Sequence, residues 1–181
     1  PTSEAPHRSW NNFEFYLSQV SERDLADDLW RYGDVRHSRK LAGRILWRFR
    51  RGEIRDTLDL ARVSGRKEGK THPATTLFMA LRMAVNEELK EIEEGIPGAI
   101  ESLVAGGRLV VLSFHSIEDR LVKRLLMRGA GRCICGTRIC LCPRKTEVKL
   151  VTRKPLTPSE NEIRDNLRAR SAKLRCVEKL P

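Results

Sequence analysis

The stretch GGRLVVLSFHSIEDR, residues 106–120, decides the fold of this chain. Two glycines suit a tight turn, and the apolar run 109–114 that follows has the length and composition of a buried strand. Polar side chains gather directly after this run, and a helical pattern then begins over 117–127. Because ligands of open α/β sheets bind at the carboxyl ends of strands, we expect the chemistry of the molecule at this junction.

The polar side chains at the junction are Ser113, His115 and Ser116. Successive residues of a strand face opposite sides of a sheet, so we place Phe114 in the core. Ser116 and Asp119 have the spacing of a capping box at the start of the next helix. That interpretation accounts for the serine and the acid and leaves His115 open as a functional side chain. A Ser–His–Asp hydrolase is not expected, because the GxSxG elbow is absent.

Helices are expected upstream of this junction, and further strands downstream of it. Ser21 is a candidate N-cap for the first helix, with Gly33 as its stop, and a second helix with a basic outer face should cover 36–51. Later helices are predicted over 57–63, 74–92 and 96–104. Strands at 147–152 and 173–179, with a short helix from Ser159 between them, read as an antiparallel hairpin with a helical insertion.

A second polar group precedes the junction. His72 stands just before the predicted helix 74–92, and Arg82 and Asn86 lie four residues apart on one face of it. Such a line of side chains could hydrogen-bond a base or orient a loop. An exposed polar face without a ligand is the alternative.

Four of the five cysteines lie close together, at Cys133, Cys135, Cys140 and Cys142. Four thiolates at this spacing could bind zinc, although zinc sites prefer CxxC pairs to the CxC pairs seen here. A reduced loop or a redox-labile pair is the alternative. The pattern is not that of a disulfide-stapled secreted domain, so a reducing, cytoplasmic setting is expected.

The net charge of +11 over 181 residues is unevenly placed. Residues 120–181 hold 17 lysines and arginines against 5 acidic residues, whereas residues 1–119 hold 18 against 19. A one-sided basic field suits a polyanion, so nucleic acid is the expected partner, with a solvated basic tail as the alternative. Arg168 and Arg170 could bind phosphate near the last strand. Alternatively, their charges could prevent a strand edge from pairing with another chain. No apolar run approaches the ~20 residues of a membrane helix.

Four segments of the chain, in this order, resemble one family: ERDLADDLWRYGDVRHSRKLAGRI, HPATTLFMALRMAVNEEL, GGRLVVLSFHSIEDRLVKR and KPLTPSENEIRDNLRARSAKLR. They are similar to the bacterial-type small-subunit rRNA cytosine-N4 methyltransferases, the RsmH or MraW family. The resemblance implies an α/β fold with a class I methyltransferase sheet and an inserted helical domain. It also implies S-adenosylmethionine as methyl donor and rRNA, or the ribosomal subunit, as substrate.

The resemblance also implies a domain plan. Residues 1–12 are a frayed N-terminus, 13–63 part of the inserted helical domain on the substrate side, 64–71 a linker, and 72–181 the closing half of the catalytic domain with a cysteine-rich loop at 129–145. By motif position and strand-end geometry we expect Ser113, His115 and Asn86 near the target base. His72, Arg82 and Ser116 should support the substrate, with Arg168 and Arg170 on phosphate.

The glycine-rich turn with which this family holds its methyl donor has no match in the sequence. We therefore expect no donor contacts within these residues and an inactive polypeptide when it is alone. The strand 109–114 is apolar on both faces, so we expect an exposed edge that pairs with a second copy or a complementing chain. A non-catalytic RNA-binding or assembly module, possibly stabilised by zinc, is the alternative function.

Overall fold

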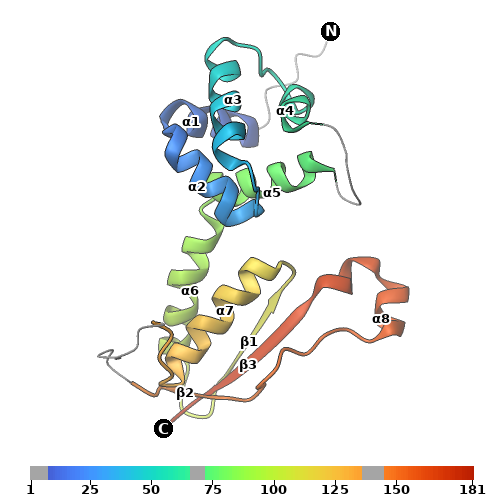
Figure 1. Cartoon of the computed structure of the whole chain (residues 1–181). Coiled ribbons are helices and arrows are strands. Elements are labelled where there is room, and N and C mark those ends of the chain that lie inside the picture. Colours follow the sequence, from blue (N-terminus) through green and yellow to red (C-terminus); the bar gives the residue numbers. More distant parts are fainter. Residues whose placement is uncertain (1–7, 66–71, 136–144) are drawn as a thin grey trace. The chain divides into compact units, whose positions relative to one another are not determined.

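The computed structural model describes residues 8–65, 72–135 and 145–181, and the chain divides into two compact units (Figure 1). We call Pro1–Glu88 the helical unit and Leu89–Pro181 the sheet unit. The helical unit extends beyond the predicted limit of residue 63, because Leu77, Ala80 and Leu81 from the next helix belong to its core. Most of the predicted linker, residues 66–71, lies outside the described residues.

Within its described residues the helical unit comprises α1 (Arg8–Gln19), α2 (Glu22–Gly33), α3 (Ser38–Arg50), α4 (Thr57–Ser64) and α5 (Pro73–Val85). The predicted cap of α2 is confirmed, since the Ser21 hydroxyl accepts a hydrogen bond from the Asp24 N–H at 3.1 Å. The helix does stop at Gly33, but the residue that adopts the left-handed conformation is Asp34, with φ of 52°. A short polar side chain tolerates that region better than most residues.

The core of the helical unit follows the apolar stripes of its helices. Leu25 and Leu29 of α2 face Ile45 and Leu46 of α3, and all four are buried. The helix predicted over 36–51 is thus confirmed as α3. Burial of a leucine or isoleucine side chain contributes about 1.5–3 kcal/mol, so this cluster supplies much of the unit's stability.

The helix predicted over 74–92 is in fact two helices, and this prediction was wrong at Asn86. Helix α5 ends at Val85, Glu87 adopts a left-handed φ of 50°, and α6 (Glu88–Ser102) begins directly afterwards. The break expected before residue 96 is absent, although Pro97 stands inside α6. The proline removes one backbone donor, but Ile96 and Ile100 beside it are buried in one cluster, which holds the helix together.

The sheet unit contains β1 (Arg108–Ser113), α7 (Ser116–Gly129), β2 (Val148–Leu150), α8 (Glu160–Asp165), the 3₁₀ helix η1 (Leu167–Ser171) and β3 (Lys173–Lys179). The strand order is β1-β3-β2, and β3 pairs antiparallel with both neighbours. The predicted antiparallel pairing of the last two strands is therefore confirmed. The two-glycine turn before β1 is also confirmed, since Gly106 has a φ of 78° and Gly107 N–H bonds to the Val104 carbonyl.

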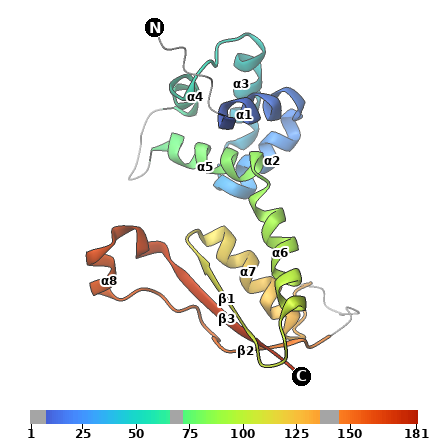
Figure 2. The same ribbon diagram turned by 180° about the vertical axis from the view of Figure 1, so that it is seen from behind.

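Helices cover one face of this sheet, as the two views in Figures 1 and 2 show. Side chains from α6, α7 and the three strands form a core there, centred on Val122, Leu126 and Val177. By contrast, Val110 and Leu112 of β1 and Phe114, directly after this strand, are exposed. Our placement of Phe114 in the core was wrong: its side chain is 53% exposed, on the face of the strand that these helices leave open.

The described residues thus combine helices with a small sheet, in agreement with the expected α/β class at this coarse level. Among the described residues β1 has a single strand neighbour, and none of them pairs with its outer edge. A search of the described helices finds none that is long and apolar enough to cross a membrane.

Candidate functional site

The carboxyl end of β1 brings together the polar side chains that the sequence singled out in the sheet unit. Ser113 is buried, and its hydroxyl donates a hydrogen bond of 3.4 Å to the Lys173 carbonyl on β3. Ser113 and Lys173 are also register partners, so the start of β3 stands beside the end of β1. The strand end is therefore built from two segments that lie sixty residues apart in sequence.

His115 is the N-cap of α7. Its Nδ1 accepts the Ile117 N–H at 3.3 Å, and the Glu118 carboxylate accepts the N–H groups of Phe114 and His115 at 3.2 and 3.1 Å. The capping box is thus formed by His115 and Glu118. Our assignment of the cap to Ser116 was wrong by one position, because α7 already begins at that residue.

Asp119 also differs from its predicted role as a capping acid. It is buried, and its carboxylate accepts hydrogen bonds from Arg175 Nε at 2.6 Å and Arg175 Nη2 at 3.1 Å, with Lys173 Nζ at 3.3 Å. Burial raises the pKa of Asp119, but the bonds and charges of Arg175 and Lys173 outweigh it, and the pKa falls below its ordinary value. This ion group fixes the start of β3 against α7, next to His115.

The two arginines proposed for phosphate binding lie close in sequence to this strand end. Arg168 and Arg170 are exposed in η1, which ends two residues before Lys173. The Asn166 side chain accepts the Arg168 N–H at 3.1 Å and so starts this helical turn. Neither guanidinium forms an ion pair among the described residues, so both remain available to an anion.

His72, Arg82 and Asn86 belong to the helical unit, whereas Ser113, His115 and Ser116 belong to the sheet unit. His72 caps α5, with its Nδ1 accepting the Ala74 N–H at 3.1 Å. Asn86 stands at the other end of the same helix, roughly 20 Å away at 1.5 Å per residue. The structure therefore does not bring His72 together with the other two side chains.

Arg82 and Asn86 do converge, on Glu88. The Arg82 Nε and the Asn86 Nδ2 donate to the Glu88 Oε1 at 2.8 and 3.3 Å. Both side chains also line an open pocket of about 200 Å³, whose walls include Phe78 and Val85. Apolar walls with a few convergent polar groups are typical of sites for small molecules.

The cysteine segment is described only in part. Cys133 Sγ lies 2.9 Å from Cys135 Sγ, whereas Cys140 and Cys142 lie outside the described residues. In the ranges that are described, no three side chains of histidine, cysteine, aspartate or glutamate gather as a metal site. Zinc therefore has no support from this structure.

Sequence reasoning missed two acids that organise these places, Glu88 and Glu118. Glu118 could have been predicted from the sequence, because it follows His115 by three residues, which is the spacing of a capping box with histidine as the N-cap. No sequence signal marked Glu88, since its role depends on α5 ending at Val85. The groups at the end of β1 can hold a loop rigidly, and those at the end of α5 can face a planar ligand.

Comparisons with known proteins agree with one another. A family model described as the MraW methylase family matches residues 10–180. The chain is 43% identical over 171 residues to a ribosomal RNA small subunit methyltransferase H from Carboxydothermus hydrogenoformans, covering 91% of this chain and 55% of that protein. It is 43% identical over 166 residues to the protein of the same name from Thermomicrobium roseum, covering 88% and 51%. The chain thus spans about half the length of the curated relatives it matches.

Proposed function

This chain belongs to the MraW methylase family, and on that basis we propose that it is part of an enzyme that methylates the N4 amine of a cytosine in small-subunit rRNA. S-adenosylmethionine would be the methyl donor. The supporting observation is the match itself, which runs over residues 10–180 and reaches 43% identity to proteins named as rRNA methyltransferases. The chain covers only about half the length of those relatives. The activity, the substrate and the methyl donor are therefore proposals that concern the whole protein.

The residues described here do not fit the methyl donor. At the end of β1 the Ser113 hydroxyl is bonded to a carbonyl, and the His115 Nδ1 and the Glu118 carboxylate are bonded to backbone N–H groups. These groups are committed to the local fold. We derive no step of the transfer from them and assign the donor contacts to the part of the relatives that this chain does not match.

For the acceptor base we propose the pocket beside Asn86. Its apolar walls, Phe78 among them, suit the faces of a pyrimidine. Asn86 commits its Nδ2 to Glu88, which leaves Oδ1 as an acceptor for an amine hydrogen of the base. Ser113 and His115 would shape the strand end, and Arg168 and Arg170 would hold the phosphates of the same RNA.

A chimera tests this function. The unmatched part of the Carboxydothermus hydrogenoformans relative is joined to residues 10–180 of this chain and incubated with labelled S-adenosylmethionine and unmethylated small ribosomal subunits. We expect label in rRNA that nucleoside analysis identifies as N4-methylcytidine. A folded chimera that labels no rRNA, or labels another atom, contradicts the proposal.

Variants of the chimera test the residue roles. Asn86→Ala should lower kcat/KM at least tenfold, because the pocket loses its amide. Asn161→Ala, an exposed asparagine in α8, is the matched control and should change nothing. His115→Ala is measured in the same assay. Unchanged kinetics in Asn86→Ala and His115→Ala would remove both residues from the site.

We also propose that the open edge of β1 accepts a further strand. The strand has one neighbour in the part of the chain that the structure describes, and Val110, Leu112 and Phe114 beside that edge are exposed. Such an edge pairs readily with another chain or with the rest of a larger sheet. Sedimentation analysis should show association of the chain that Leu112→Lys weakens. A monomer at all concentrations would contradict self-association.

A further inference from the structure

A pair of thiols follows α7 in the sheet unit, and the proposed function assigns it no role. Cys133 and Cys135 are separated by one residue, and their Sγ atoms lie 2.9 Å apart, which is closer than ordinary van der Waals contact between two sulfur atoms. A disulfide bond is ~2.05 Å long, so the sulfurs need to approach by less than about 1 Å. The reduced pair is therefore already close to the separation of its oxidised form.

The local fold sets the position of this pair. Directly after α7 the chain turns back over the end of the helix, since the Arg132 N–H donates to the Met127 carbonyl at 2.9 Å. Gly131 has a φ of 71°, and a Cβ at this position would clash with the Thr146 side chain. The turn therefore requires glycine, and it determines the direction in which the two cysteines leave the helix.

The two sulfurs differ in exposure and in hydrogen bonding. Cys135 is exposed, whereas Cys133 is half-buried. The Cys133 Sγ accepts the Cys135 N–H at 3.3 Å. A donor directed at a sulfur favours the thiolate form, which is the nucleophile in disulfide exchange. A dissolved disulfide thus reaches Cys135 first, and Cys133 is placed to attack the Cys135 sulfur in the next step.

The surroundings of the pair carry a net positive charge. Ile134, the residue between the two cysteines, lines a pocket of about 700 Å³ between α6 and α7. The charged residues in this lining are three cations and two acids: Arg124, Arg128, Lys145, Glu93 and Glu147. Lys145 pairs with Glu147 at 2.7 Å, and the exposed Arg132 adds a further cation directly before the pair. Such a field attracts an anionic reactant and stabilises a thiolate.

We propose that Cys133 and Cys135 form a reversible disulfide by thiol–disulfide exchange with a small anionic disulfide of the glutathione type. The Cys135 thiolate attacks one sulfur of oxidised glutathione, forms a mixed disulfide and releases one glutathione thiolate. The Cys133 thiolate then attacks the Cys135 sulfur, forms the intramolecular disulfide and releases the second glutathione thiolate.

The exchange balances without a further reactant. The two cysteine sulfurs lose two electrons, the glutathione disulfide gains them, and the two thiol protons pass through water to the glutathione thiolates that leave. Because Cys135 is exposed, reduced glutathione can attack it and reverse both steps. No step requires methyl transfer, so this proposal and the proposed function can fail separately.

The sequence allows a direct measurement, because trypsin cleaves after Arg132 and Arg138. Peptide 133–138 then contains only this cysteine pair, and peptide 139–144 contains Cys140 and Cys142. The 181-residue chain is equilibrated with a chelator in buffers of increasing oxidised glutathione, quenched in acid, alkylated and digested. We expect peptide 133–138 to lose two hydrogens and both alkylation sites as the oxidised fraction rises, and to recover them after treatment with dithiothreitol.

Two comparisons test the contribution of the fold and the order of the steps. The equilibrium constant for closure should be about tenfold larger in the folded chain than in synthetic peptide 133–138, because the fold holds the sulfurs close together. Cys133→Ser should accumulate the mixed disulfide of Cys135. Cys135→Ser should react with oxidised glutathione about fivefold more slowly than Cys133→Ser, because the remaining sulfur is half-buried.

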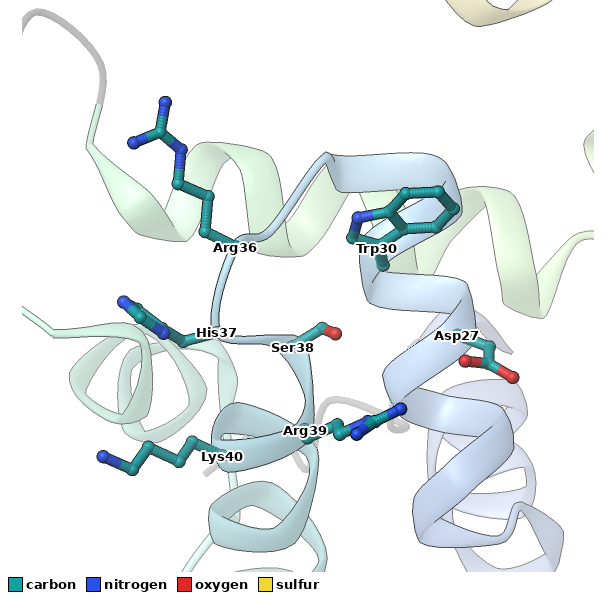
Figure 3. Close-up of a pocket in the computed structure, with 7 residues that line it drawn as sticks. All are labelled: Asp27, Trp30, Arg36, His37, Ser38, Arg39 and Lys40. Atoms are coloured by element: carbon teal, nitrogen blue, oxygen red, sulfur yellow. The ribbon is translucent and has the colours of Figure 1, made fainter.

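Arg132→Gln tests the role of charge. It should slow the reaction with oxidised glutathione about threefold and leave the reaction with neutral hydroxyethyl disulfide unchanged, since only the anion is attracted. Arg39→Gln is the matched control. Arg39 is an exposed arginine at a basic pocket of the helical unit whose described lining, drawn in Figure 3, contains no cysteine. This control should leave both rates unchanged.

Three results would overturn the proposal. Peptide 133–138 that stays fully alkylated in oxidised glutathione alone would show that the pair does not close. A disulfide that joins peptides 133–138 and 139–144 would assign the exchange to a different pairing of cysteines. A closure constant equal to that of the synthetic peptide would show that the one-residue spacing, and not the structure, brings the sulfurs together.

Discussion

The helical unit and the sheet unit bury their apolar residues differently. In the helical unit the described helices share one cluster centred on Leu25, Leu29 and Ile45. In the sheet unit α6 and α7 cover one face of three strands, while Val110 and Leu112 remain exposed on the other. The first unit therefore depends on its core, and the second depends more on polar anchors such as the ion group of Asp119.

The largest effect should come from a cavity in the core of the helical unit. Leu29 is fully buried, so Leu29→Ala should lower the free energy of unfolding by about 3–5 kcal/mol. Leu58→Ala is the matched control, since Leu58 is 63% exposed in the same unit. Amide hydrogen exchange, measured separately for each unit, gives the stability change of both variants. Equal acceleration in the sheet unit would show that the two units unfold together and break the comparison.

Removal of the anchor should have nearly as large an effect in the sheet unit. The side chains of Asp119 and Arg175 are 9% and 10% exposed, and Asp119→Asn leaves a buried guanidinium without its charge partner. We expect a loss of about 3 kcal/mol in chemical denaturation. Glu53→Gln, which breaks an exposed pair with Arg51, should cost less than about 0.5 kcal/mol. A similar loss of unfolding free energy in both variants would show that the Asp119–Arg175 pair does not anchor the sheet unit.

The two histidine caps allow a matched test across the units. His72→Ala at α5 and His115→Ala at α7 should each cost about 1 kcal/mol, because one backbone donor loses its acceptor. Ser116→Ala should cost little, since that serine is not the cap. The thermal midpoint reports all three. A larger fall in the thermal midpoint for Ser116→Ala than for His115→Ala would show that Ser116 is the cap, as the sequence analysis predicted.

The smallest effect is a difference in how the two units respond to pH. Burial and the hydrogen bond to Asp28 raise the pKa of Tyr16 in the helical unit, so stability present below about pH 10 is lost as the pH rises above it. The lowered pKa of Asp119 acts in the opposite direction in the sheet unit. Its contribution is present above about pH 4 and is lost as the pH falls further.

Hydrogen exchange of the two units at pH 3.5, 7 and 10.5 measures this difference. Burial also raises the pKa of Asp28, which favours the helical unit in acid. The sheet unit should therefore open first in acid and the helical unit first in alkali. The same order of opening at both extremes would contradict the assignment of these shifts.

Much of the architecture was predictable from sequence, because strong local signals agreed with the tertiary structure. The apolar stripe of α3, the cap at Ser21 and the limits of β3 all follow from residue spacing. The break at Asn86 was not predictable, since the apolar period of α5 continues into α6. Only the divergence of the two cores, Leu81 in one and Ile96 in the other, shows where the chain changes partners.

The candidate site was predictable in position and not in detail. The junction after β1 does collect polar groups, but His115 caps α7, Asp119 pairs with Arg175, and Phe114 is exposed. The cap differs because α7 begins one residue earlier than the sequence pattern indicated, whereas Phe114 is exposed because α6 and α7 cover the other face of the sheet. The partner of Asp119 also lies fifty-six residues away, which no local pattern can reveal.

The two histidine caps also fix where each imidazole carries its hydrogen. A ring nitrogen that accepts a backbone N–H carries no hydrogen itself, so His72 and His115 are held as the tautomer with hydrogen on Nε2. Each neutral ring can then only donate from Nε2, to a phosphate oxygen or a base carbonyl.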